Sequence, residues 1–125
     1  MDAAQNYTQN DVSAMAQSEL ESRALIRTAS ALNSIKENWD ERQNELADAL
    51  EKNRKLWTII ASAMSETECP QPEEIKKSIL NLSMFIFQRT VDMLANPAPA
   101  KLDALININM NIAKGLSGNS GAPEK

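Results

Sequence analysis

Apolar residues recur every three or four positions along most of the chain, which is the spacing of α-helices that bury one face. Leu25 and Leu32 lie in the first such segment, where Ser18 and Glu21 have the spacing of a capping box near a helix start. Residues 106–112 alternate like a strand, but no second alternating segment exists to pair with them, so we also predict a helix there. The pattern predicts four helices, over residues 13–36, 39–66, 72–95 and 100–116.

Prolines mark the breaks between these helices. Pro70 and Pro72 end the second segment, because proline lacks a backbone N–H and pushes the residue before it out of the helical region. Two further prolines separate the last two segments. With connections this short, we predict a small all-α bundle of four to five helices, formed by one domain over residues 1–116. Residues 117–125 are poor in apolar side chains and are predicted to form a flexible, disordered tail.

The predicted helix over residues 72–95 is apolar on two sides. Ile79 and Ile86 lie on one face, while Met84 and Val91 lie on another. A helix of this kind is either buried by neighbours on both sides or keeps one face for a partner. The predicted core collects apolar seam positions of all four helices: Leu25, Leu32, Ile35, Leu46, Leu50, Trp57, Ile60, Ile79, Leu82, Ile86, Leu105 and Ile112.

Composition favours a single helical domain in water. The 125 residues fit one domain, and 42% hydrophobic with 24% charged residues is ordinary for a soluble protein. Aromatic residues make up only 4%, too few for a β-sandwich or barrel. The longest apolar run, at 84–87, is far shorter than the ~20 residues of a membrane helix, and the N-terminus carries no export signal. We therefore expect a cytoplasmic protein that does not enter a membrane.

Catalysis and metal binding lack their usual residues. The chain has no histidine, the commonest general base and metal ligand, and its one cysteine, Cys69, can form neither an internal disulfide nor a thiolate zinc site. We therefore expect no enzyme, with no catalytic, metal-binding or cofactor-binding residues and no cofactor. The net charge of −4 also disfavours direct nucleic-acid binding, because phosphate recognition needs a clustered basic face.

Asparagines and flexible apolar residues on the helix seams are the remaining candidates for function. Asn53, Asn107 and Asn109 either fix the register of neighbouring helices by hydrogen bonding or present amides to a bound partner. Methionines such as Met84 and Met93 either fill the core or form an adaptable groove. The candidate partner-binding residues are Asn53, Trp57, Met84, Phe87, Val91, Ile108 and Asn109.

Short motifs follow one another along the chain in a characteristic order. They are Tyr7, Glu21 with Arg23-Ala24-Leu25, Leu50-x-x-Asn53-x-x-Leu56-Trp57, Ile79-Leu80-x-Leu82-Ser83, and Leu105-Ile106-x-Ile108-Asn109-x-x-Ile112-x-x-Gly115-Leu116. In order and spacing, they resemble the flagellar biosynthesis regulator FlaF family of alphaproteobacteria over residues 7–116. The polar segment 1–17 departs from the family pattern, because it lacks the Thr/Ser-Pro-Arg stretch of many members.

The resemblance implies a small cytoplasmic protein that is needed for flagellin production. It implies a dedicated export chaperone for flagellin, which promotes flagellin synthesis and secretion and counters FlbT, a repressor of flagellin translation. Flagellin's terminal segments form helices in the filament, so a monomer awaiting export carries an amphipathic surface that must be kept from self-association. The implied partners are therefore flagellin and FlbT, and the family supplies no catalytic residues.

Two alternatives stay open at this point. The first is a regulator that binds the flagellin transcript directly and activates its translation, although the acidic balance of the chain argues against RNA binding. The second is a homo-oligomer in which the surplus apolar face closes on a copy of itself, which is compatible with the chaperone hypothesis.

Overall fold

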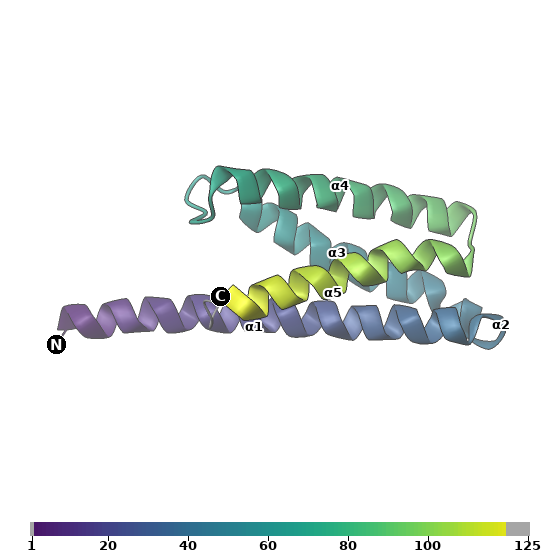
Figure 1. Ribbon diagram of the computed structural model, residues 1–125, viewed down its shortest axis with the longest axis horizontal. Helices are drawn as coiled ribbons and strands as arrows, with labels where there is room; N and C mark the ends of the chain where they lie inside the picture. The colour runs from purple at the N-terminus through teal and green to yellow at the C-terminus, as the bar shows by residue number, and fades with distance from the viewer. Residues whose placement is uncertain (1, 120–125) are drawn as a thin grey trace.

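The computed structural model describes the backbone of residues 2–119 and the side chains of residues 18–117 (Figure 1). Over this part of the chain every regular element is a helix and none is a strand, which confirms the predicted all-α bundle. The elements are α1 (Asp2–Glu37), α2 (Trp39–Arg42), η1 (Gln43–Glu45), α3 (Leu46–Ser65), α4 (Glu73–Ala95), η2 (Pro99–Lys101) and α5 (Leu102–Asn119).

The first helix is longer than the sequence pattern predicted. α1 begins at Asp2 rather than at residue 13, so Ser18 lies inside the helix and the predicted capping box is wrong. The physical reason is that no glycine or proline occurs before Pro70, so nothing in the polar segment stops the helix. Figure 1 shows the N-terminal part of α1 projecting beyond the end of α5.

The predicted second helix is interrupted near its start. The 3-10 turn η1 separates α2 from α3, whereas we predicted one helix over residues 39–66. Arg42 donates two hydrogen bonds to the Glu45 carboxylate, at 3.1 and 2.7 Å, and a further one to the Ser34 hydroxyl of α1. The bond to Ser34 ties Arg42 to α1. The bonds to Glu45 hold the pKa of the Glu45 carboxyl below its usual value.

α1 and α5 lie side by side and run in opposite directions (Figure 1). Each buries a stripe spaced by three and four residues, and the two stripes face each other. Polar contacts join α1 to α5 near both ends of α5. The Ser22 hydroxyl donates to the Ala113 carbonyl at 3.0 Å, and Lys36 forms an ion pair with Asp103 at 2.6 Å. The stripes consist of Ser22, Leu25, Ala29 and Leu32 on α1 and Leu102, Leu105, Asn109 and Ala113 on α5.

α4 packs antiparallel on α3 through a narrow buried stripe that contains two hydroxyl residues. The Ser83 hydroxyl donates to the Ile79 carbonyl at 2.9 Å, and the Thr90 hydroxyl donates to the Ile86 carbonyl at 2.6 Å. Their polar groups are therefore satisfied within α4 itself, which leaves a surface of small groups for α3 to approach. We call Ile79, Ser83, Ile86, Thr90 and Met93 the inner stripe of α4.

The core matches the predicted one with a few exceptions. Ile79, Leu82 and Ile112 are half-buried rather than buried, because they line a cleft of about 340 Å³ between the start of α4 and the end of α5. α5 continues to Asn119, beyond the predicted end at 116, and the remainder of the predicted flexible tail, 120–125, lies outside the described residues. The buried apolar residues outside the predicted core set are Ala29, Met93, Leu102 and Ala113.

One side-chain amide joins α1, α3 and α5 at the centre of the bundle. The Asn109 carbonyl oxygen accepts the indole N–H of Trp57 at 2.9 Å. The Asn109 Nδ2 donates to Asn53 Oδ1 at 2.7 Å and to the Thr28 hydroxyl at 2.8 Å. Asn53, Trp57 and Asn109 are completely buried, so this network is shielded from water.

Substituting Asn109 with alanine should lower the free energy of unfolding by about 2–4 kcal/mol, because the Trp57 indole and the Asn53 oxygen would stay buried without partners. Urea unfolding followed by circular dichroism measures this difference. The matched control is Asn107→Ala on the same helix, where the side chain is exposed and a change within ~0.5 kcal/mol is expected. Equal effects of the two substitutions would contradict the importance of the network.

Candidate functional site

α4 lies at the edge of the bundle farthest from α1 (Figure 1). Its inner stripe covers α3, which leaves the rest of its circumference to solvent or to η2 and α5. The position explains how a helix that is apolar on two sides can exist in a small bundle. One of the two apolar faces packs on α3, and much of the other stays exposed.

The second apolar face of α4 forms a continuous exposed line. Met84, Val91 and Leu94 keep 58%, 67% and 54% of their surface exposed, respectively. Leu80 and Phe87 lie on the same face and are half-buried. The spacing of the five residues is four, three, four and three, which is the heptad spacing of a coiled-coil seam. We call Leu80, Met84, Phe87, Val91 and Leu94 the outer seam.

The outer seam faces away from α5. Arg89 lies on the opposite side of α4, where it donates to the Lys101 carbonyl at 3.0 Å and stacks over the Phe85 ring at 5.1 Å. Asp92 pairs with Lys101 at 2.9 Å, and this hydrogen bond holds the pKa of the Asp92 carboxyl below its usual value. These contacts fix α4 to the start of α5 without using any residue of the outer seam.

Part of the outer seam runs through an uncharged stretch of α4. No ionisable residue occurs between Ser78 and Gln88, which covers more than half of the seam. The exposed side chains of Asn81 and Gln88 follow the seam along one rim. The surface therefore combines apolar side chains with neutral amides, which is the chemistry of a protein-binding surface and not of a phosphate-binding one.

The predicted partner-binding residues separate into two groups. Met84 and Val91 are exposed on the outer seam, as a partner site requires. Phe87, on the same seam, and Ile108 on α5 are both half-buried and pack against the core. Leu80 and Leu94 were missing from the prediction, although continuing the heptad in both directions would have included them.

Asn53, Trp57 and Asn109 were also predicted to contact a partner, and here the structure corrects the prediction. All three are completely buried and bonded to one another, so a partner on the folded bundle cannot reach them. Their placement fits the other interpretation, in which seam asparagines fix the register of helices. Asn107, the third seam asparagine, is exposed.

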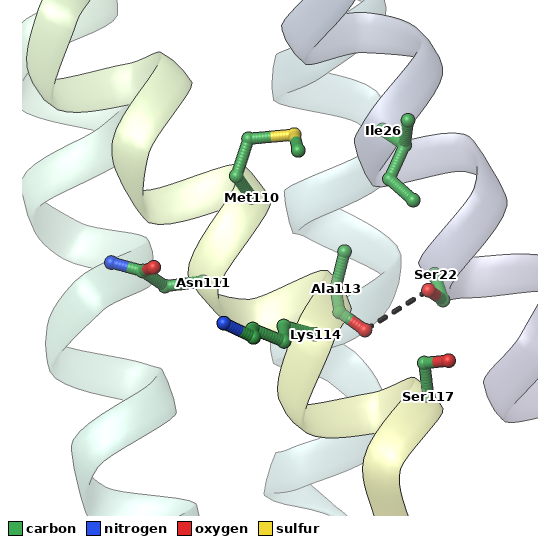
Figure 2. Close-up of a pocket in the computed structure, with 7 residues that line it drawn as sticks. All are labelled: Ser22, Ile26, Met110, Asn111, Ala113, Lys114 and Ser117. Atoms are coloured by element: carbon green, nitrogen blue, oxygen red, sulfur yellow. Dashed lines mark hydrogen bonds between the residues drawn. The ribbon is translucent and has the colours of Figure 1, made fainter.

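Two of the other surface hollows are lined by α5. A groove of about 570 Å³ runs between α1 and α5, and Figure 2 shows Ile26 and Met110 on its two sides and the bond from Ser22 to Ala113 across it. The other hollow is the cleft between α4 and α5 described above. Within the described residues, no group of three or more Asp, Glu, Cys or His is placed to hold a metal ion. No helix in the same part of the chain is both long and apolar enough to cross a membrane.

Comparison with known protein families identifies the family of this chain. The sequence profile of the family described as flagellar protein FlaF matches residues 3–116, which is nearly the whole chain. The chain belongs to the FlaF family. Comparisons with curated proteins and with solved structures give no match. The FlaF family has a role in flagellar biosynthesis.

The two faces of α4 should respond differently to the same substitution. Ile86→Asp places an unpaired carboxylate in the completely buried inner stripe, at a cost of several kcal/mol against a total stability of ~5–15 kcal/mol, so the FlaF bundle should unfold. Met84→Asp, two residues away on the outer seam, should leave the helical circular-dichroism spectrum and the urea midpoint nearly unchanged. Unfolding by Met84→Asp would show that the outer seam belongs to the core.

Proposed function

We propose that this FlaF protein is a non-enzymatic chaperone that binds flagellin in the cytoplasm and delivers it for export. The single observation that carries the proposal is the outer seam, an apolar face of α4 on which Met84, Val91 and Leu94 stay exposed. Exposed lines of large apolar residues on soluble proteins are typical of surfaces that bind other proteins. The FlaF family match supplies the flagellar setting of the proposal.

Flagellin is the partner that this surface suits best within flagellar biosynthesis. A flagellin monomer awaiting export must cover the amphipathic helical segments that later pack in the filament. A helix with an apolar stripe is recognised by a complementary apolar groove or seam. Binding of this kind needs no catalytic group, no metal ion and no cofactor.

The proposal includes promotion of flagellin synthesis and opposition to FlbT. A chaperone that binds newly made flagellin couples the supply of flagellin to its export, which would counter a repressor of flagellin translation such as FlbT. In this mechanism FlaF acts through protein contacts and not through the transcript. The net charge of −4 and the uncharged rim of the outer seam support that choice.

The experiment that tests the proposed function is size-exclusion chromatography with light scattering, on this protein alone and mixed with monomeric flagellin from the same organism. At about 10 µM of each protein, a complex with micromolar or tighter affinity should give a new peak at the summed mass. An unrelated acidic helical protein of similar size is the control for nonspecific capture. Two unchanged peaks would refute flagellin binding.

The transcript-binding alternative is tested separately by a gel shift on the flagellin leader RNA. We expect no shift at about 150 mM salt, because an acidic protein without a basic face gains little from counterion release. A shift that survives this salt, together with no flagellin complex, would replace the chaperone proposal by direct regulation of translation.

A further inference from the structure

We propose that the outer seam of α4 receives one amphipathic α-helix of flagellin, about four turns long, whose own apolar residues repeat every 3.5 positions and whose flanking residues are uncharged. The inference rests on the proposed function and adds to it the surface, the shape and the chemistry of the bound segment.

The spacing of the outer seam defines the shape of the bound segment. Its members alternate between steps of four and three residues from Leu80 to Leu94, a distance of about 21 Å along the helix axis. Side chains with this spacing interdigitate with a second helix of the same period, because each side chain inserts between four residues of the facing helix. An extended strand, with a rise of about 3.3 Å and a side-chain period of two, does not match the spacing.

The lack of charge along much of the outer seam predicts which residues flank the apolar stripe of the bound helix. The seam has no ionisable residue between Ser78 and Gln88, and Arg89 and Asp92 are bound to Lys101 through groups that face away from it. A charged residue beside the apolar stripe of the bound helix would lose hydration here without gaining an opposite charge. The matching helix therefore carries neutral polar residues such as Asn, Gln, Ser or Thr at its flanks.

A second copy of this chain is a weaker occupant of the seam. Two copies each carry a net charge of −4 and repel one another. A stable protein interface uses about 20–30 residues on each side, many more than the five residues of the outer seam. A short contact of this kind instead suits reversible binding of one helix, which a chaperone must release when its cargo is exported.

The first test compares flagellin affinity in two variants of the full chain. Met84→Glu combined with Val91→Glu places two charges on the seam and should weaken binding by at least about thirtyfold, measured by isothermal titration calorimetry. The matched control is Leu20→Glu, whose side chain is 60% exposed. It lies on α1, on the other side of the bundle from α4 (Figure 1), and the affinity of this variant should equal that of the wild type. Urea unfolding verifies that both variants keep the stability of the wild-type bundle.

The outcomes separate this inference from the proposed function. If the wild-type protein does not bind flagellin, the proposed function itself fails. If the wild type binds and the double variant binds equally well, or Leu20→Glu loses as much affinity, flagellin binding stands and the assignment to the outer seam is overturned. If the double variant only converts a dimer into a monomer on light scattering and leaves flagellin affinity unchanged, the occupant is a second copy.

The second test addresses the uncharged flanks of the bound helix. Gln88→Glu and Gln88→Lys place opposite charges at the same exposed position on the rim of the seam. Both should weaken flagellin binding by a similar factor of about three to ten, because either charge is desolvated without a partner. If one sign strengthens binding while the other weakens it, the bound helix carries charged flanks and that part of the inference is wrong.

Discussion

The Asn109 side chain holds the centre of the bundle in place. Its carbonyl oxygen accepts the Trp57 indole N–H, and its nitrogen donates to Asn53 and Thr28, so a single amide on α5 determines how α1 and α3 lie against it. Apolar stripes alone tolerate a shift of one helix along another, because many registers bury similar areas. A shift here would leave several buried polar groups unpaired, each at a cost of about 1–3 kcal/mol. The network therefore selects one arrangement of three helices, around which the other contacts form.

The network leaves one buried polar group without a hydrogen bond, which lowers the stability of the bundle. The Asn53 Nδ2 is buried and has no hydrogen-bond partner among the described residues. Rotating that amide would turn its nitrogen toward the Asn109 nitrogen, so the hydrogen bond that Asn53 Oδ1 accepts from Asn109 fixes an orientation in which the Asn53 Nδ2 stays unsatisfied. An apolar pair at these positions would avoid this penalty but would not define the register. The network thus lowers the stability of the bundle but defines a unique packing of α1, α3 and α5.

Much of this arrangement follows from the sequence, and the exceptions have physical causes. The 3.6-residue period identified every long helix, and the prolines located the ends of α4. The start of α1 was missed because Ser18 and Glu21 imitate a cap within an unbroken helix. At η1, Arg42 bonds to Ser34 of another helix, a tertiary contact that local patterns do not contain. Likewise, the spacing placed Asn53 and Asn109 on apolar seams, but it could not tell whether their amides face another helix or a partner.

α4 takes no part in the amide network, and this difference explains why the candidate site lies there. Its inner stripe satisfies its hydroxyls within the helix and packs on α3 through apolar groups, while Arg89 and Asp92 fix its C-terminal half to Lys101. The outer seam carries little of this packing, since Met84, Val91 and Leu94 are exposed. Of its members, Phe87 also packs against the core. A binding surface built this way can gain and lose a partner helix without disturbing the core. That independence is what a protein needs if it must hold its cargo and then release it unchanged.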